Sequence, residues 1–549
     1  DYYSCVDGNS GEQADAEQAY IQAELKGPET WVYIPPEGRP EGWSDGGFRT
    51  PVVRLRKAIY GHPNSGSYWE EHCNKFLVQA GFKPIEAWPS CFWHEKLKLM
   101  LSVYVDDFKL AGPKDSLKKG WDLIRKNIQM EDPTPLQLYL GCIHRKFEGK
   151  LEKDGPVVNG IEYDMESFLA SCVQRYLQLC ADSGDQTGLS KSAVKRSLKA
   201  KKKASETATC EIDPSEFLTV VTTPFLNDND QKDSPQGAPC DDPNHPDAVT
   251  CPWCCHRFVK GKIDPLGPDK KNTKSVDSAR PGAGAIAASS TGAGGVPGEN
   301  TLNHEAASVL MKILYAARMA RFDLLKATNA LACKLTKWDK KCDLQLRRLV
   351  AYIWSSLGKR LVGYVSKDDK QSGLHLYTDA DLGGCPDTQR STTGVFLCIR
   401  GNHTMFPLVA ISKRQSCTSV STPEAELVAG SHGLVRELMP ALDMCDKMLP
   451  PGYDAIFHED NQAMIRVIET GRNPTMRYLH RTHRISIATL HEIITGQVAD
   501  TKIDCKYTTS AEMAADIFTK GFTDKVKWVH ATQSVGIIDV ADIPRSKTK

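Results

Sequence analysis

Two adjacent aspartates, Asp106 and Asp107, separate two apolar runs at residues 99–105 and 108–111. The β-branched and apolar residues of these runs predict two strands that meet at a turn, which would place both carboxylates at a hairpin. Neighbouring carboxylates repel each other unless a cation neutralises them, and phosphoryl transfer uses divalent ions bridged by carboxylates. Most acidic pairs in turns are simply solvated, so this pair indicates a metal site only together with other motifs.

A second group of acids is spread over the C-terminal part of the chain. Residues 373–381 alternate apolar and polar side chains and predict a strand that carries Asp379. A later strand is expected to end at Asp460, and residues 509–520 predict a capped helix that carries Asp516. Each acid alone is more often a helix cap or a solvated turn. In combination with a helical glutamate, they would form the four-carboxylate set of two-metal phosphodiester hydrolysis.

Two glutamates compete for the helical position in this set. Ser421-Thr-Pro-Glu424-Ala-Glu426 predicts the start of a helix, with Ser421 as the N-cap and a proline in the first turn. Glu424 is placed for a capping box with Ser421, which is an adequate structural role. Glu426 is the other candidate.

The composition limits the class of protein. At 549 residues the chain is long enough for about two to four domains. The 69 basic and 68 acidic residues nearly cancel, so contacts to nucleic acid must come from local patches. The 18 cysteines are scattered, and no apolar run reaches the roughly 18 residues that span a bilayer. We expect an intracellular protein without a membrane partner, and a fragment or processed product because no initiator Met precedes Asp1.

The composition also divides the chain into regions. Residues 14–147 have the mixed pattern of a folded α/β unit. Residues 183–300 have too little apolar surface to offset chain entropy and are predicted to be mostly disordered. Residues 303–361 carry apolar side chains at helical spacing and predict two or three packed helices. From Gly373 onward, strands and helices alternate as in an α/β domain with its own core.

The first region resembles the copia-type reverse transcriptases of LTR retrotransposons, because its motifs occur in the order and at the spacings of that family. The motifs are Gln13-Ala-Asp15-Ala-Glu-Gln-Ala-Tyr20, Trp31-Val-Tyr-Ile-Pro-Pro36, Val53-Arg-Leu-Arg-Lys-Ala-Ile-Tyr60-Gly61, Trp69, Tyr104-Val-Asp-Asp107 and Tyr139-Leu-Gly141. The resemblance implies that Asp15, Asp106 and Asp107 are metal-binding catalytic carboxylates. It also implies that Tyr20 is the aromatic gate against a ribose 2′-hydroxyl, with a plain core residue as the alternative.

Tyr60, Gly61 and Asn64 are further candidate contacts to substrate. Gly61 would let the backbone approach a nucleotide or template where a Cβ would intrude. The family commonly has Leu-Lys-Gln-Ser-Pro after Tyr-Gly, whereas this chain has His62-Pro-Asn64-Ser-Gly66. Few residues precede Asp15, so the fingers subdomain is expected to be largely missing and the polymerase incomplete in this chain.

The C-terminal region resembles the copia-type ribonuclease H. The motifs are Tyr377-Thr-Asp-Ala-Asp381, Arg390-Ser-Thr-Thr-Gly394, Ser412-Lys-Arg-Gln415, Thr422-Pro-Glu-Ala-Glu426, Glu459-Asp-Asn-Gln462, Arg481-Thr-His483 and Ala515-Asp-Ile-Phe-Thr-Lys520. The resemblance assigns catalysis to Glu426 rather than Glu424, and the metal-binding catalytic set is Asp379, Glu426, Asp460 and Asp516. Arg390 is a candidate phosphate contact, and His483, His491 or neither would assist product release.

These inferences predict an α/β and α+β multidomain protein. The domains in chain order are a reverse transcriptase palm with the start of the thumb (1–182), a disordered insert (183–300), a helical thumb or connection (301–365), a ribonuclease H domain with a mixed sheet and flanking helices (366–525) and a C-terminal tail (526–549). The implied function is RNA-dependent DNA synthesis and two-metal hydrolysis of RNA in RNA/DNA hybrids. The alternative is a decayed or repurposed retroelement fragment that binds nucleic acid without polymerase activity.

The implied cofactor is Mg²⁺, two ions per active site, with Mn²⁺ as a substitute. The implied partners are an RNA template, a DNA primer, an RNA/DNA hybrid and dNTPs, in a cytoplasmic virus-like particle or the nucleus. The insert also holds possible metal ligands at Cys240, His245, Cys251, Cys254, Cys255 and His256. Their spacing favours scattered reduced thiols over a zinc site, which is the alternative.

Overall fold

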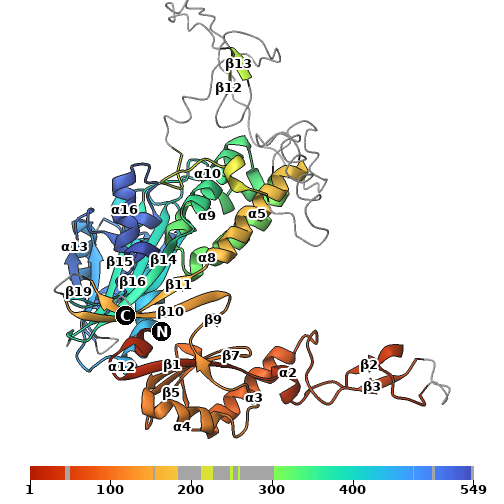
Figure 1. Cartoon of the computed structure of the whole chain (residues 1–549). Coiled ribbons are helices and arrows are strands. Elements are labelled where there is room, and N and C mark those ends of the chain that lie inside the picture. The colour runs from red at the N-terminus through yellow and green to blue at the C-terminus, as the bar shows by residue number, and fades with distance from the viewer. Residues whose placement is uncertain are drawn as a thin grey trace, which may run out of the picture. The chain divides into compact units, whose positions relative to one another are not determined.

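The computed structural model describes residues 1–43, 50–151, 155–183, 212–226, 248–250, 257–259, 302–369, 371–473, 475–497 and 501–545 (Figure 1). The chain forms two compact units. The first comprises Asp1–Ala170, Lys312–Ala330 and Ser356–Lys549, and the second comprises Ser171–Met311 and Leu331–Ser355. Several sheets with flanking helices confirm the predicted mixed α/β class. Among the described residues, no helix is long and apolar enough to cross a membrane.

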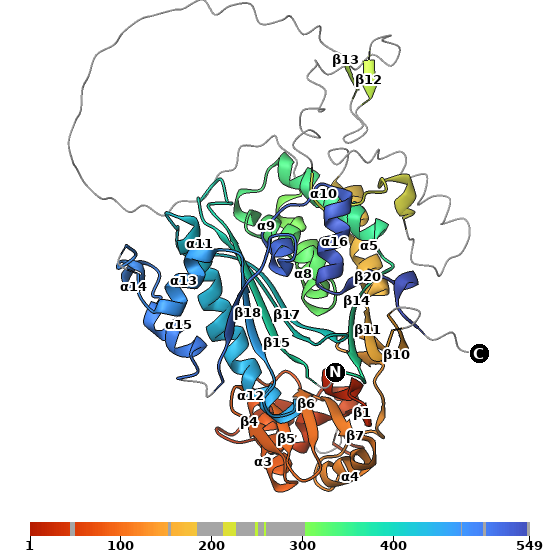
Figure 2. The same ribbon diagram turned by 90° about the vertical axis from the view of Figure 1, so that its left-hand side faces the viewer.

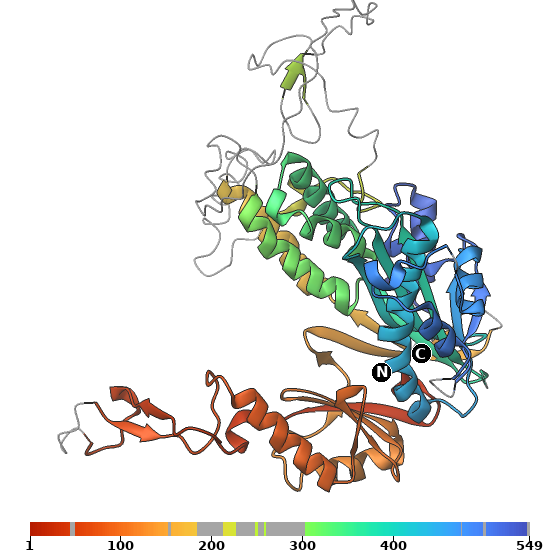
Figure 3. The same cartoon turned by 180° about the vertical axis from the view of Figure 1, so that it is seen from behind.

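A six-stranded sheet forms the N-terminal part of the first unit. Its order is β4 (Lys83–Ile85), β5 (Trp88–His94), β6 (Leu99–Tyr104), β7 (Asp107–Pro113), β1 (Asn9–Asp15) and β8 (Thr134–Pro135). Helices α3 (Ser65–Gln79) and α4 (Lys114–Ile124) lie against this sheet (Figure 3). Their buried Trp69, Leu77, Leu117 and Trp121 pack with Phe108 of β7 in one apolar core, which fixes the ends of the acid-bearing strands.

A ten-stranded sheet forms the larger part of the same unit (Figure 2). Its main path is β19 (Asp504–Tyr507), β18 (Ala455–Glu459), β15 (Gly373–Asp381), β16 (Thr392–Arg400), β17 (Met405–Arg414), β14 (Lys359–Ser366), β11 (Val157–Asp164), β10 (Cys142–Lys150) and β9 (Leu138–Tyr139), and β20 (Ile537–Asp539) pairs with β14. Strands β15, β18 and β19 are parallel, and the other pairs are antiparallel. Parallel neighbours end at the same sheet edge, which brings the ends of β15 and β18 together.

Helices cover the ten-stranded sheet around the acids. Helix α11 (Thr422–His432) continues through a π-helical segment, η5 (Gly433–Leu438), into α12 (Met439–Met448). These helices share an apolar core with α13 (Gln462–Thr470), α15 (Ile487–Ile494) and strands β15 and β16. In Figure 2 they lie together on one side of the sheet.

The sheet crosses the domain boundaries that the sequence predicted. Strands β10 and β11 come from the predicted palm region, and β14 begins in the predicted connection, yet all three pair in one sheet with the predicted ribonuclease H strands. The predicted C-terminal tail is also folded in part. Helix α16 (Lys525–Ser534) buries Trp528, which is 1% exposed, and β20 pairs with β14. Pairing between distant segments is a tertiary property, so composition did not reveal it.

The helices of residues 303–355 are divided between the two units, and the second unit also contains the short strands β12 (Ala248–Thr250) and β13 (Arg257–Val259). Helices α8 (Asn303–Met319), α9 (Leu325–Ala332) and α10 (Lys340–Ser355) confirm the predicted helical periodicity over residues 303–361. Most of the predicted disordered insert lies outside the described residues. Within it, residues 212–226 pack on α10, where Arg347 donates a hydrogen bond to the Phe217 carbonyl and Arg348 donates one to the Thr223 carbonyl.

Candidate active sites

The first acidic site lies at the hairpin between β6 and β7, as predicted. Asp107 opens β7 and is the register partner of Asp15 at the end of β1. Val105 turns the chain with a left-handed φ of 57°, and the indole Nε1 of Trp69 donates a hydrogen bond of 2.7 Å to the Val105 carbonyl. The Asp106 carbonyl accepts a hydrogen bond from the Ala16 amide. The three acids, although far apart in sequence, therefore share one corner of the six-stranded sheet.

The charges of these acids are coupled. Partial burial, with the nearby Asp15 and Asp106 carboxylates, raises the pKa of Asp107 to about 6. A raised pKa in the absence of a cation is what mutual repulsion produces, and a bound divalent ion would reverse it. The two sets of described acids whose oxygens all converge within 4.8 Å nevertheless lie elsewhere, in the ten-stranded sheet.

Two of the predicted substrate contacts, Tyr20 and Tyr60, lie against each other. The Tyr20 and Tyr60 rings lie 4.5 Å apart between centroids, and Tyr60 is 59% exposed. Gly61 has a φ of +91°, and a Cβ added there would meet no atom within 4 Å, so the glycine serves the turn and leaves open space. Asn64 precedes α3, but its side chain makes no capping hydrogen bond.

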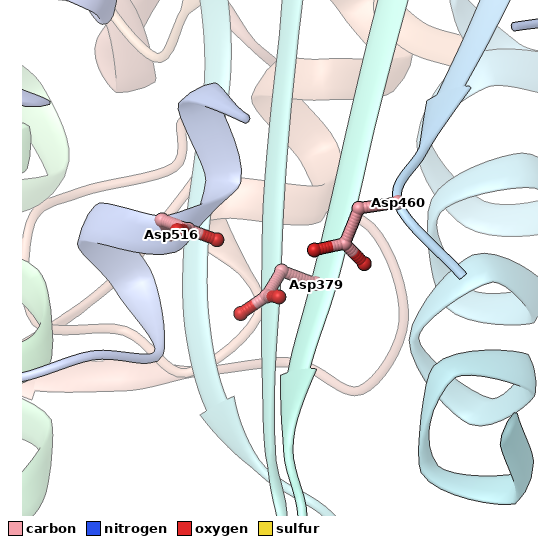
Figure 4. Close-up of side chains that lie close together, drawn as sticks. All are labelled: Asp379, Asp460 and Asp516. Carbon is pink, nitrogen blue, oxygen red and sulfur yellow. The ribbon is translucent and has the colours of Figure 1, made fainter. Parts of the chain in front are cut away.

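The second acidic site brings three of the predicted carboxylates together (Figure 4). Asp379 comes from β15, Asp460 follows the end of β18, and Asp516 comes from η6 (Ala514–Phe518). One oxygen from each lies within 4.8 Å of the others. Asp379 and Asp516 are only 2% and 7% exposed, so neither is a solvated turn residue.

Close packing at Gly394 places η6 over the sheet. Gly394 is the register partner of Asp379, and a Cβ added to Gly394 would lie 2.9 Å from the Ala515 carbonyl oxygen. The Thr519 hydroxyl donates a hydrogen bond to the Asp379 carboxylate. The capped helix predicted over residues 509–520 is wrong in its extent, since only the 3-10 helix Ala514–Phe518 forms and its N-cap lacks a side-chain bond.

A second acidic triad consists of Glu426, Glu459 and Asp460, whose oxygens also lie within 4.8 Å of one another. It shares Asp460 with the first triad. Side chains alternate between the faces of a strand, so Thr378 and Asp379 point to opposite faces of β15. Thr378 donates a hydrogen bond of 3.0 Å to Glu459, whereas Thr519 donates one to Asp379, so different neighbours orient the carboxylates of the two triads.

Glu459 was missed as a site residue by the sequence analysis. It appears there only within the Glu-Asp-Asn-Gln motif, although it is 0% exposed. Strand β18 is buried at nearly every position, so alternation of polar and apolar residues could not reveal which way its side chains point. The available signal was a second acid directly before Asp460 in an apolar strand, where an unpaired carboxylate is costly.

The donor set fits divalent cations that prefer oxygen ligands. Burial and neighbouring acids raise the pKa of Glu426 to about 11 and that of Asp516 to about 7, so the protonated form of each carboxyl group is favoured until a cation binds. Glu426 Oε2 is buried and has no hydrogen-bond partner among the described residues. Carboxylate oxygens are the usual ligands of Mg²⁺. The unpartnered oxygen is an observation that a bound cation would explain.

Lys520 supplies one positive charge to the site. Its Nζ lies 2.7 Å from Asp516 Oδ1 and 3.6 Å from Asp379 Oδ1. The side chain remains 43% exposed, so it reaches the acids from the solvent side and can withdraw. Lys520 pairs only with these two carboxylates, and no described basic side chain forms an ion pair with Glu426 or Glu459.

Glu424 is separate from both triads. Its carboxylate lies 3.1 Å from His483 Nε2 and accepts hydrogen bonds from the Tyr478 hydroxyl and the Val420 amide. The predicted capping box is wrong in detail, because Ser421 makes no side-chain cap bond and Glu424 accepts from Val420 instead. The arrangement gives Glu424 a structural role at the start of α11 and leaves Glu426 near the acids.

The two candidate histidines have different surroundings. His483 lines an open groove of about 530 Å³ together with Arg390, Thr388, Cys417, Thr418 and Thr482. His491 instead hydrogen-bonds through Nδ1 to the Ile468 carbonyl near the end of α13. The groove therefore combines Arg390 and His483 among the predicted substrate contacts. The candidate zinc ligands of the insert lie outside the described residues.

One comparison with known protein families matches the N-terminal region of the chain. Residues 3–153 match the family model described as reverse transcriptase (RNA-dependent DNA polymerase). These residues include β1 and the β6–β7 hairpin with all three acids of the first site. The reverse transcriptase prediction for the N-terminal region is therefore supported by an independent comparison.

Curated relatives extend the similarity along the chain. The Ty1-ER2 Gag-Pol polyprotein of Saccharomyces cerevisiae is 20% identical over 531 residues, covering 94% of this chain and 24% of the relative. The Ty1-DR1 polyprotein of the same yeast is 20% identical over 77% of this chain and 18% of its own length. The matches confirm the predicted resemblance to a copia-type retrotransposon Pol polyprotein. The chain spans about a quarter of the length of the Ty1-ER2 relative.

Proposed function

We propose that this chain is the reverse transcriptase and ribonuclease H part of a retrotransposon Pol polyprotein. In this proposal the six-stranded sheet is the polymerase palm, the helices of residues 303–355 belong to the thumb or connection, and the sheet around Asp379 is the ribonuclease H domain. The observation that carries the nuclease assignment is the convergence of Asp379, Asp460 and Asp516 within 4.8 Å, together with the buried Glu426 Oε2, which has no hydrogen-bond partner among the described residues.

In the nuclease, Asp379, Glu426, Asp460 and Asp516 would hold two Mg²⁺ ions. The bound ions would supply the Lewis acidity that activates water and stabilises the leaving oxygen. The protein contributes fixed positions, because β15, the end of β18, η6 and α11 each deliver one carboxylate from a packed element. Thr519 orients Asp379, and Lys520 offsets repulsion between Asp379 and Asp516 until the site is loaded.

The groove beside Glu424 would contact the substrate backbone. Arg390 offers a guanidinium that suits phosphate oxygens, and His483 lines the same groove with its Nε2 3.1 Å from Glu424 Oε1. An RNA/DNA hybrid presents 2′-hydroxyls in a wide, shallow minor groove, so such a site would recognise backbone and shape rather than sequence.

In the polymerase, Asp15, Asp106 and Asp107 would hold the cations that bind the incoming dNTP and the primer end. Tyr20, whose ring lies against that of Tyr60 at an angle of 44°, would oppose a ribose 2′-hydroxyl. The template would be RNA, in agreement with the matching family of RNA-dependent DNA polymerases, and the primer would be DNA.

The nuclease proposal is tested with the purified chain and an RNA strand labelled within an RNA/DNA hybrid. The chain should cleave the RNA strand only with Mg²⁺ or Mn²⁺, and Asp379→Asn should slow cleavage by roughly 100-fold or more, because one carboxylate ligand loses its charge. Asp368→Asn is a matched control, since Asp368 lies outside both acidic triads. Equal cleavage by Asp379→Asn and the parent chain would refute the proposal.

A further inference from the structure

We infer that Glu459 is a metal ligand and that Glu426, Glu459 and Asp460 form one cation position of the second acidic site. The inference deepens the proposed ribonuclease H function and rests on it. It adds a fifth carboxylate to the four that the sequence motifs predict, and it assigns the two cations to two triads joined by Asp460.

The position of Glu459 is the first observation. Its carboxylate is fully buried, yet one of its oxygens lies within 4.8 Å of ligand oxygens from Glu426 and Asp460. Three carboxylates at such short separations cannot all remain charged in a buried site unless a cation is bound. Glu459 is therefore unlike a surface acid, whose charge water would screen.

The second, independent observation is the orphaned oxygen of Glu426. Glu426 is 3% exposed, and its Oε2 has no hydrogen-bond donor among the described residues. Buried polar atoms almost always have a partner, so an orphaned oxygen beside two other carboxylates calls for one. A cation held by the triad would supply it.

Hydrogen bonds already orient Glu459 for this role. The Thr378 hydroxyl donates to Oε2 at 3.0 Å, and the Asn461 amide donates to Oε1 at 3.1 Å. A carboxylate oxygen has two acceptor positions, so each oxygen of Glu459 keeps one for a cation. Fixing a ligand carboxylate through outer hydrogen bonds is a recurring feature of metal sites.

The charge distribution distinguishes the two triads. Lys520 pairs with Asp379 and Asp516 of the first triad. Within the described part of the chain, no basic side chain forms an ion pair with Glu426, Glu459 or Asp460. Three carboxylate oxygens together with water molecules would satisfy the octahedral preference of Mg²⁺.

The experiment counts bound cations rather than turnover. The full chain carrying Asp106→Asn and Asp107→Asn, which removes the first acidic site, is titrated with Mn²⁺ while free Mn²⁺ is followed by electron paramagnetic resonance. We expect two bound ions in this background. Adding Glu459→Gln should weaken one of them by about 10- to 100-fold and leave the other unchanged.

Two further variants keep the test decisive. Glu162→Gln removes a glutamate that is 1% exposed and pairs with Arg545 away from the acids, so it should leave both ions bound. Thr378→Val keeps all five carboxylates but removes one orienting hydrogen bond, so it should weaken the same ion even if Glu459→Gln fails to fold.

The outcomes separate this inference from the proposed function. Unchanged Mn²⁺ number and affinity in folded Glu459→Gln, or in Thr378→Val if the former does not fold, would overturn the ligand role of Glu459. The nuclease proposal would survive that result if Asp379→Asn still abolished hybrid cleavage. Retained cleavage by Asp379→Asn would instead refute the nuclease proposal itself.

Discussion

The two acidic sites of this chain hold their carboxylates in different ways. At the first site, Asp15 and Asp107 face each other across two strands, and Asp106 lies in a hairpin turn beside exposed tyrosines. At the second site, mostly buried acids from several distant elements form two triads, and within each triad one oxygen from each acid lies within 4.8 Å of the others. An open site obtains part of its charge balance from water, whereas a buried one depends on cations or protons. The second site should therefore respond more strongly to metal and pH.

The largest expected effect separates the two sites by their chemistry. Asp107→Asn should reduce primer extension on an RNA template by roughly 100-fold, because it removes a charged ligand of the first site. Hybrid cleavage by the same variant should stay close to that of the parent chain. Both rates are measured on one protein preparation. Loss of both activities, or of neither, would break the distinction between the sites.

The pH dependence of the metal-free chain is the next effect. The folded pKa of Asp516, about 7, exceeds the usual value of 3.8 in an unfolded chain. The protonated form therefore stabilises the fold below about pH 4, and this contribution is lost as the pH rises through about 7. Asp516→Asn should raise the free energy of unfolding at pH 8 by on the order of 1–3 kcal/mol, with little effect at low pH.

Urea unfolding in EDTA at pH 4 and pH 8 measures this prediction. Asp107→Asn is the comparison from the first site. It should change the free energy of unfolding at pH 8 by less than Asp516→Asn does, because Asp107 is more exposed and its pKa is about 6. If the free energy of unfolding of Asp516→Asn depended on pH as steeply as that of the parent chain, the proposed repulsion among the acids of the second site would be contradicted.

Lys520 should have opposite effects on the empty and the loaded second site. Lys520→Met removes the ammonium that pairs with Asp516, so the metal-free chain should lose about 1 kcal/mol of stability, a modest value because the lysine is partly exposed. Mg²⁺ should then raise the melting temperature more than in the parent, since no ammonium competes for the acids. Lys447→Met, from an unrelated surface position, should change neither value.

The smallest effects concern the two histidines. His483→Ala should lower hybrid cleavage by about tenfold, because it removes a polar contact of the Arg390 groove. His491→Ala should leave cleavage unchanged and cost about 1 kcal/mol of stability through the lost bond to Ile468. Steady-state cleavage and thermal unfolding measure the pair. A larger cleavage defect in His491→Ala would reverse the assignment of the groove.

Local sequence patterns predicted the elements that carry the acids. The alternating run of residues 373–381 forms β15 with those bounds, and β18 ends at Glu459, directly before Asp460. Strand alternation and turn residues are short-range signals, so they are readable without the fold. The hairpin at Asp106 and Asp107 followed from the same signals.

Long-range pairing and burial were not readable in that way. Strand β14 joins β11 to the sheet that contains β15, although the sequence placed these strands in three regions. Glu459 lies in a strand buried at nearly every position, where alternation carries no information. The short 3-10 turn that carries Asp516 depends on its contact with Gly394, which belongs to another strand. Each of these features is set by tertiary packing.

The most direct test of the account is anomalous diffraction from crystals of the chain grown with Mn²⁺. The account predicts two peaks at the second site, one bound by Asp379, Asp460 and Asp516 and the other by Glu426, Glu459 and Asp460, with the Lys520 ammonium displaced. A site without Mn²⁺ peaks, in which Lys520 still pairs with Asp379 and Asp516 at saturating Mn²⁺, would contradict it.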